Sequence, residues 1–320
     1  MTGTIVTADS NPAAPTIAPA PTRRVGRFAP SPTGELHLGS LLAAVGSYLE
    51  ARKNRGLWCL RMDDLDTARN VPGSADRILN TLELFGFQWD GPVVYQSDRA
   101  PRYRDALADL QRCGHVFACA CTRRSLAGAS ESGCQQNCCL KALPPAGNAL
   151  RFALPAAGPT LDFADALQGH QHIERAAFPD VIVRRRDGVF AYQLAVVIND
   201  HDAGVTDVVR GADLLGSTPW QIGIQQALGL PRPRYLHLPL LTEPGGAKLS
   251  KTARSVPLDP GRAPTLLYRA LQLLRQAPPA SLEGSSLAEQ WQWAEDAWSV
   301  HRLVGLTEVR LPELGTPGPL

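Results

Sequence analysis

The apolar residues in the first third of the chain follow the spacings of alternating strands and helices. A short apolar run over 25–29 predicts a strand, apolar spacing over 41–49 predicts a helix with one buried face, and 57–62 predicts a second strand. In a strand–turn–helix unit, unpaired N–H groups and the positive end of the helix dipole lie beside the end of the strand. The pattern therefore predicts an α/β fold with an anion site near residues 30–40.

Elements later in the chain are more interrupted. Helical spacing predicts helices over 75–85, over 99–113 and from Pro264 onward. Runs rich in β-branched residues at 181–183 and 195–198 predict two further strands. We expect the α/β domain to continue through these elements and to end in a helical region.

Composition narrows the class of protein but does not identify a partner. The 320 residues are 44% hydrophobic and 19% charged, which is typical of a globular chain, and the net charge of +2 is too small to indicate RNA binding. Arg184–Arg186, Arg232 and Arg234 are candidates for a local basic face, although such runs are more often solvated surface. Residues 1–22 are rich in Ala, Pro and Thr, lack the basic start and apolar core of a leader, and are expected to form a disordered tail. Because no apolar run could span a bilayer, we expect a cytoplasmic protein without a membrane partner.

Five of the seven cysteines lie between positions 119 and 139, in a segment rich in Ser, Gly and Pro that indicates an insertion. Cys119 and Cys121 from one hairpin, with Cys134 and Cys138 from another, predict a tetrahedral Zn²⁺ site that stabilises a segment with little core of its own. Cys139 could replace Cys138. The alternatives are a disulfide, which a reducing compartment disfavours, or unrelated buried thiols, which the clustering disfavours. The remaining two, Cys59 and Cys113, are expected in the core.

Two short segments indicate the chemistry. Residues 30–40 read Pro-Ser-Pro-Thr-Gly-Glu-Leu-His-Leu-Gly-Ser, and residues 248–252 read Lys-Leu-Ser-Lys-Thr. A turn histidine and a Lys-Leu-Ser-Lys run are each common on their own. In this order across one α/β domain, they indicate an enzyme that uses ATP to form an adenylate.

These segments carry a resemblance to a known family. Residues 27–31 running into 37–40 resemble the HIGH element of class I glutamyl- and glutaminyl-tRNA synthetases, and residues 248–252 resemble their KMSKS loop. Three blocks between them are similar to further family blocks: Arg61–Asp66, Phe190–Ala195 and Val209–Asp213. The match runs in order over residues 24–258. Within the family, the chain most resembles the shortened glutamyl-queuosine tRNA(Asp) synthetases, in which Ser likewise stands where the second His of HIGH would be, here at Ser40.

The resemblance implies an α/β fold: a Rossmann-type class I aminoacyl-tRNA synthetase catalytic core with a zinc-binding insertion and a short helical C-terminal region. The expected divisions are a disordered tail (1–22), the first half of the core (23–116), the insertion (117–176), the second half of the core (177–258) and the helical region (259–320). Only 68 residues, 320 minus 252, follow the second signature, so we expect no anticodon-reading domain after it. In well-known relatives a Tyr ligates zinc where this chain has Cys134, a change expected to strengthen zinc binding.

Adenylate formation requires the enzyme to position two anions and to neutralise the charge that develops as pyrophosphate leaves. The resemblance implies that Mg²⁺-ATP is bound by Pro30, His37, Gly39, Ser40, Lys248, Ser250 and Lys251. His37 would donate to the phosphates, Gly39 would let the nucleotide approach the backbone, and Lys248 and Lys251 would supply mobile positive charge. We assign the catalytic roles to His37, Lys248 and Lys251.

A glutamate substrate needs an acidic group for its ammonium and a guanidinium for its carboxylates. By resemblance, L-glutamate is bound by Arg27, Phe28, Ala29, Pro30, Ser31, Asp63, Tyr192 and Arg210. Arg27 and Arg210 would contact carboxylates and Asp63 the ammonium, although relatives commonly carry the longer Glu at that position. Arg210 could instead be structural and pair with Asp207 or Asp213.

The resemblance implies a monomeric enzyme that activates L-glutamate with ATP, without tRNA, and transfers it to the queuosine base at the wobble position of tRNA(Asp). One alternative is a truncated glutamyl-tRNA synthetase that charges a tRNA 3′ end. Another is a non-catalytic RNA-binding or regulatory paralogue, which would be expected to carry damaged signatures. The intact His37, Gly39, Lys248 and Lys251 favour an enzyme.

Overall fold

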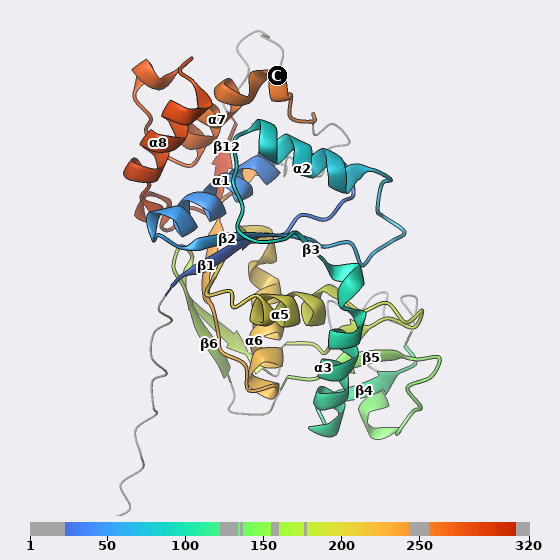
Figure 1. Ribbon diagram of the computed structural model, residues 1–320. Coiled ribbons are helices and arrows are strands. Elements are labelled where there is room, and N and C mark those ends of the chain that lie inside the picture. Colours follow the sequence, from blue (N-terminus) through green and yellow to red (C-terminus); the bar gives the residue numbers. More distant parts are fainter. Residues whose placement is uncertain are drawn as a thin grey trace, which may run out of the picture.

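A computed structural model describes residues 23–121, 134, 137–154, 160–175, 178–242 and 256–311 (Figure 1). The strands are β1 (Val25–Phe28), β2 (Leu57–Met62), β3 (Val94–Tyr95), β4 (Val116–Cys119), β5 (Ala149–Phe152), β6 (Thr160–Asp165), β7 (Gly169–Glu174), β8 (Val181–Arg184), β9 (Asp207–Gly211), β10 (Arg234–Leu238), β11 (Leu240–Thr242) and β12 (Glu308–Arg310). The α-helices are α1 (Leu38–Lys53), α2 (Ser74–Leu84), α3 (Ala100–Arg112), α5 (Tyr192–Asp202), α6 (Thr218–Ala227), α7 (Ala263–Leu273) and α8 (Leu287–Ala297). Short 3-10 helices are η1 (Gln96–Arg99), η2 (Cys138–Leu140), η4 (Ala212–Ser217), η6 (Pro260–Arg262), η7 (Ala280–Leu282) and η8 (Val300–Leu303).

Two parallel arrays meet at the centre of the molecule. One is β1-β2-β3, and the other is β7-β6-β10-β9, in which β7 alone runs antiparallel to its neighbour. They adjoin along β1 and β9, because the N–H of Thr206, next to β9, donates to the carbonyl of Val25 in β1 at 2.9 Å. The carboxyl ends of β1 and β9 are therefore neighbours. Open α/β sheets bind their ligands at this edge. The expected α/β Rossmann-type fold and the early strand–helix–strand unit are confirmed. The expected single buried face of α1 is wrong, because every residue from Ala44 to Ala51 is buried.

One of the expected strands is part of a helix. Residues 195–198 were expected to form a strand, but they lie within α5. Every side chain from Leu194 to Ile198 is buried, because α5 is packed between α3, α6 and β8. A helix that is buried all round has no polar face, so its apolar run cannot be distinguished from a buried strand by periodicity.

A separate antiparallel sheet, β4-β5-β8, carries the cysteine-rich segment at the lower right of Figure 1. The expected insertion (117–176) contains strands of both this sheet and the central one, since β6 pairs with β10 through Asp165 and Tyr235. Cys113, at the exposed end of α3, does not belong to the core, so that expectation is wrong; Cys59 is half-buried.

Helices α7 and α8 pack beside α1, at the upper left of Figure 1. The core there is aromatic: Tyr48 meets Trp58, Phe87 and Trp291 with ring centroids 4.9–5.4 Å apart. The indole N–H of Trp298 donates to the buried carboxylate of Glu50 at 2.9 Å. The C-terminal helices thus cover the side of α1 that faces away from the sheet. Within the described residues, none of the helices has the length and apolar character needed to cross a membrane.

Candidate active site

A large cavity of about 730 Å³ opens where β1 and β9 end. The turn between β1 and α1 forms one wall, and the residues after β9 and β10 form the other. Predicted residues that line it are Phe28, Pro30, Ser31, His37, Gly39 and Ser40. The structure therefore brings the first signature segment to the edge of the sheet that favours phosphate.

His37 forms the N-cap of α1 and is held by reciprocal hydrogen bonds. The backbone N–H of His37 donates to Ser40 Oγ at 2.7 Å, and the N–H of Ser40 donates to His37 Nδ1 at 3.2 Å. Because Nδ1 accepts, the proton of the neutral ring lies on Nε2, the nitrogen that can donate to a phosphate. A Cβ atom at Gly39 would lie 3.1 Å from two atoms of this ring, so an alanine there would require the ring to move by a few tenths of an ångström.

Lys248, Ser250 and Lys251 lie outside the described residues. The described chain stops at Thr242 and resumes at Val256. Both ends are at the large cavity: Leu241 and Pro257 line it, and Pro257 forms a β-bridge with His37. The binding roles of the three residues remain predictions.

A second cavity of about 250 Å³ adjoins the first, with Ser31 and Thr33 in both walls. Asp63, at the end of β2, and Tyr192, at the start of α5, line it as well. The predicted ammonium ligand and one predicted pocket residue thus face a common space. Ala29 lies between the two cavity-lining residues Phe28 and Pro30 and is half-buried.

A buried chain of alternating charges lies behind the second cavity. Arg27 donates to Asp200 at 3.2 Å, Arg61 donates to Asp200 at 2.5 Å, and Arg61 also donates to Asp63 at 2.6 Å. The Arg27 guanidinium also donates to the Val209 carbonyl at 3.2 Å. Two cations balance two anions, so this chain is neutral by itself.

The two carboxylates of the chain respond differently to burial. Burial raises the pKa of Asp63 and outweighs the opposing effect of Arg61. At Asp200 burial also acts to raise the pKa, but Arg27 and Arg61 together lower it below the ordinary value. Asp200 is therefore the carboxylate that both arginines contact. Asp63, at the other end of this row of charged side chains, lines the second cavity.

Arg210 is 5% exposed, and its contacts differ from those of Arg27. Its guanidinium donates to His237 Nε2 at 3.0 Å, to Thr218 Oγ1 at 2.9 Å and to the Tyr192 hydroxyl at 3.2 Å, with a longer contact of 3.5 Å to the Leu214 carbonyl. It also lies over the Tyr235 ring, 5.6 Å from the centroid. In the part of the chain that the structure describes, none of these partners is a carboxylate. The alternative pairing with Asp207 is wrong, because that carboxylate binds Arg24 and Arg234.

Sequence reasoning missed the residues that surround Arg210 and join Arg27 to Arg61. These are Asp165, Asp200, Thr218 and His237. One signal was available: His237 stands between Leu236 and Leu238 in an apolar strand, where a polar side chain is unusual unless it has a partner.

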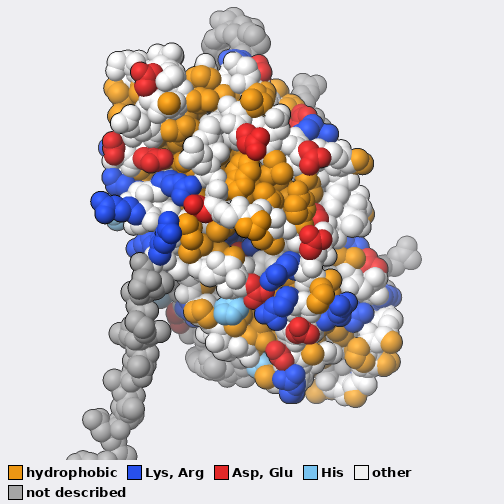
Figure 2. Space-filling view, viewed as in Figure 1, with side chains coloured by type: hydrophobic (Ala, Val, Ile, Leu, Met, Phe, Trp, Pro, Cys, Tyr) orange, Lys and Arg blue, Asp and Glu red, His pale blue; other side chains and the backbone are white. Residues whose placement is uncertain are grey.

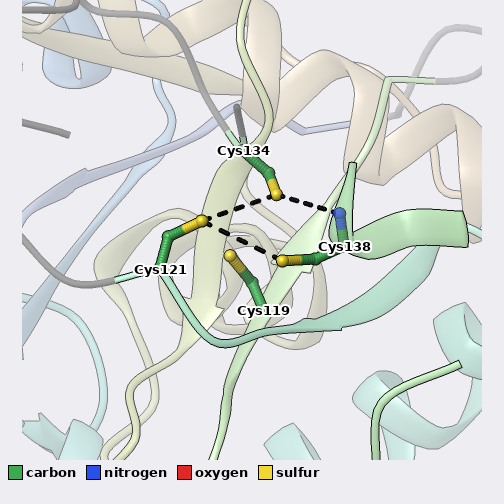
Figure 3. A group of neighbouring side chains, drawn as sticks. All are labelled: Cys119, Cys121, Cys134 and Cys138. Atoms are coloured by element: carbon green, nitrogen blue, oxygen red, sulfur yellow. Dashed lines mark hydrogen bonds between the residues drawn. The ribbon is translucent and has the colours of Figure 1, made fainter. Parts of the chain in front are cut away.

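The four cysteines Cys119, Cys121, Cys134 and Cys138 converge in space (Figure 3). Their sulfur atoms all lie within 4.8 Å of one another. Cys121 Sγ lies 3.7 Å from Cys134 Sγ and 3.9 Å from Cys138 Sγ. A tetrahedral ion with Zn–S bonds of about 2.3 Å requires sulfur atoms ~3.8 Å apart, so the described cluster fits Zn²⁺.

Cys138 contributes to the cluster rather than Cys139, since Cys138 is buried and Cys139 is exposed. Although burial raises the pKa of the Cys138 thiol, hydrogen bonds from the Ala120 backbone and the other three thiols lower it to about 7. A zinc ligand must be a thiolate, and this thiol ionises near neutral pH.

Two of the candidate basic residues are paired with acidic side chains. Arg234, whose side chain is 36% exposed, pairs with Glu50 and Asp207, and Arg185 pairs with Asp187 and, at 3.5 Å, with Asp66. On the face drawn in Figure 2, Lys and Arg side chains are interspersed with Asp and Glu. The Arg234 charge joins α1 to β9 through Glu50 and Asp207, and a basic face that includes it stays a prediction.

Comparison with solved structures identifies the class of fold. A glutamate-tRNA synthetase from Elizabethkingia anophelis superposes with a TM-score of 0.75 and 24% identity, covering 91% of this chain and 68% of that one. A glutamate tRNA ligase from Elizabethkingia meningosepticum, in complex with its amino acid, gives a TM-score of 0.74 at the same identity, covering 91% of this chain and 67% of that one. At this identity the likeness shows the fold alone: that of a class I tRNA synthetase catalytic domain.

Sequence comparison is more specific. Residues 24–259 match the family model for tRNA synthetases class I (E and Q), catalytic domain. The protein named Glutamyl-Q tRNA(Asp) synthetase in Aromatoleum aromaticum is 51% identical over 284 residues, which cover 86% of this chain and 89% of that protein. A protein of the same name in Ectopseudomonas mendocina is 49% identical over 286 residues, covering 88% and 95%. The chain therefore belongs to the class I tRNA synthetases and, within them, to the family of glutamyl-Q tRNA(Asp) synthetases.

Proposed function

We propose that this protein activates L-glutamate with ATP to form glutamyl-adenylate, without tRNA, and transfers the glutamyl group to the queuosine base at the wobble position of tRNA(Asp). The names of its relatives support the acceptor. The observation that carries the amino-acid assignment is Arg210, a buried guanidinium whose partners in the described residues are all uncharged.

A buried charge without a counter-ion is costly, because it has lost its water and gained no opposite charge. A substrate carboxylate that reaches Arg210 beside Tyr192 would be the first anion to contact its guanidinium directly, among the groups that the structure describes. The carboxylate of Asp63 in the adjoining cavity would receive the substrate ammonium, and Ser31 would line the same space. Arg27 is the weaker candidate for a carboxylate ligand, since it already donates to Asp200. This arrangement suits an amino acid with an additional acidic group.

Mg²⁺-ATP would occupy the large cavity, with its phosphates at the N-terminus of α1. His37 would donate from Nε2, and Gly39, Ser40 and Pro30 would leave room for the nucleotide. Lys248, Ser250 and Lys251 would approach from the segment that begins and ends at the cavity. The glutamate carboxylate oxygen would then attack the α-phosphate in line as pyrophosphate leaves, and the cations would stabilise the departing charge.

Zn²⁺ would be held by Cys119, Cys121, Cys134 and Cys138, beside the β4-β5-β8 sheet. Its contribution is structural, because four thiolates leave the ion no open position for a substrate.

Pyrophosphate exchange tests the activation step. With each amino acid in turn, and with and without tRNA, exchange should depend on glutamate and should proceed without tRNA. Exchange with another amino acid, or none with any of them, would refute the proposed activation.

A transfer assay tests the acceptor. Radiolabelled glutamate should be incorporated into tRNA(Asp) that contains queuosine and not into the same tRNA without it. Removal of the 3′-terminal adenosine should leave labelling intact. If labelling requires that adenosine and ignores queuosine, the protein is a truncated glutamyl-tRNA synthetase; if exchange and transfer both fail, a non-catalytic paralogue is favoured.

A further inference from the structure

His237 is a completely buried histidine in β10, and none of the steps proposed above uses it. Its Nδ1 lies 2.6 Å from Asp165 Oδ2, and the side chains of both residues are 0% exposed. Its Nε2 lies 3.0 Å from the Nε of Arg210. The ring therefore stands between a carboxylate and a guanidinium.

The contacts of Asp165 determine which ring nitrogen carries the proton. Its Oδ1 accepts from the backbone N–H groups of Leu167, Gln168 and His237 at 3.0, 2.9 and 3.2 Å. Burial raises the pKa of Asp165, but the hydrogen bonds from His237 and these backbone groups lower it overall, so the carboxylate is ionised. An ionised carboxylate only accepts, and His237 Nδ1 must therefore be the donor.

The protonation state of His237 is consistent with its contact with Arg210. Burial lowers the pKa of His237, and the nearby Arg210 acts in the same direction, against Asp165. The ring is thus neutral at physiological pH, with its proton on Nδ1 and a lone pair on Nε2. That lone pair accepts from Arg210 Nε, whose N–H can only donate.

Three contacts hold the guanidinium of Arg210 in one plane: Nε to His237, Nη2 to Thr218 and Nη1 to Tyr192. A carboxylate in the place of the imidazole would fix the guanidinium equally well but would neutralise its charge. A neutral ring orients the guanidinium without placing an anion in contact with it. Asp165 in turn orients the ring without touching Arg210 in any described contact.

We infer that Asp165 and His237 form a positioning relay that holds Arg210 ready for the substrate carboxylate and so determines affinity for the amino acid. This inference rests on the proposed function, because it assigns Arg210 to the substrate. His237 acts through Arg210 and is not a catalytic residue.

The test compares two amide substitutions of His237 in tRNA-independent pyrophosphate exchange. An Asn side chain places a polar atom near the position of Nδ1, and a Gln side chain places one near Nε2. His237→Asn should keep a donor to Asp165 but lose the acceptor for Arg210, so KM for glutamate should rise by about tenfold or more. His237→Gln should restore the acceptor and keep KM for glutamate within about threefold of the wild-type value. KM for ATP should change by less than about twofold in both variants.

Tyr103→Phe serves as the control for loss of a buried hydrogen bond, because the Tyr103 hydroxyl accepts from Asn199 at 2.7 Å without contacting Arg210. It should leave both KM values unchanged. Thermal unfolding of every variant verifies that it is folded. If His237→Asn does not fold, Asp165→Asn provides the same measurement, since it removes the acceptor that orients the ring, and it should also raise KM for glutamate selectively.

The relay is refuted if His237→Asn or Asp165→Asn exchanges at wild-type KM for glutamate, or if His237→Asn and His237→Gln raise both KM values equally. That result differs from failure of the proposed function, in which the wild-type protein itself would show no glutamate-dependent exchange.

Discussion

Arg210→Met separates a substrate-binding arginine from a structural one. Methionine keeps much of the length and apolar body of the side chain but removes its charge and its hydrogen bonds. Arg210 is 5% exposed and has no carboxylate partner among the described residues. In the free protein no described carboxylate contacts this guanidinium directly, because the His237 ring separates it from the ionised Asp165, so the substitution breaks no direct ion pair.

Arg210→Met should have a large effect on the affinity for glutamate and a small effect on the free energy of unfolding without glutamate. Loss of one partner from a buried charge pair costs about 2–5 kcal/mol, so the affinity for glutamate should fall roughly 30-fold to several thousandfold. Without glutamate, the free energy of unfolding should fall less than it does when an arginine in a direct buried ion pair is removed. Glutamate should raise the melting temperature of the wild-type protein but not that of the variant.

Arg61→Met is the matched control for burial. Arg61 is also 5% exposed, but it pairs with both Asp63 and Asp200. Its removal leaves buried carboxylates without their cation, so the free energy of unfolding should fall by about 3–5 kcal/mol. Urea unfolding and exchange kinetics measure the two effects. A wild-type KM for glutamate in Arg210→Met, or a loss of stability as large as that of Arg61→Met, would show that Arg210 is structural.

Three further predictions concern the nucleotide and zinc sites. Lys251→Ala should slow pyrophosphate exchange by about 10²-fold with little change in KM for glutamate, and exchange at the wild-type rate would contradict its assigned role. Gly39→Ala should raise KM for ATP by roughly threefold to tenfold by displacing the ring of His37, whereas Gly216→Ala, where a Cβ meets no atom within 4 Å, should not. The purified protein should contain one zinc per chain by elemental analysis, and Cys134→Ser should lose it; absence of zinc from protein prepared without chelator would leave the cysteine cluster unexplained.

The parts of the fold predicted correctly from the sequence depend on local patterns. The helix after the first signature was predictable because Leu41, Leu42, Val45 and Leu49 repeat with helical spacing, and all four side chains are buried. The cysteine cluster was predictable for a similar reason: its members are separated by short spacings that two neighbouring hairpins can close. In both cases the pattern lies within about 20 residues, so it can be recognised without knowing which distant segments come together.

The parts that could not be predicted depend on contacts between distant residues. Asp200 lies 173 positions from Arg27 and 139 from Arg61, and they meet only when α5 packs behind β1 and β2. The sequence of α5 gives little help, since its apolar run resembles a buried strand. The contact of Asp165 with His237, 72 positions apart, likewise requires β6 to lie next to β10.

Arg27 and Arg210 illustrate why burial and residue type are not enough to assign a site. Both follow apolar residues near the carboxyl end of a central strand, and both are almost completely buried. Arg27 shares Asp200 with Arg61, so its charge is balanced within the fold and serves to join β1 to α5. Arg210 is held by a neutral histidine, a threonine and a tyrosine, so none of its described hydrogen-bond partners is a carboxylate. The two arginines therefore differ in the charge of the side chains that contact them, and those of Arg210 come from residues 192, 218 and 237 in three separate elements.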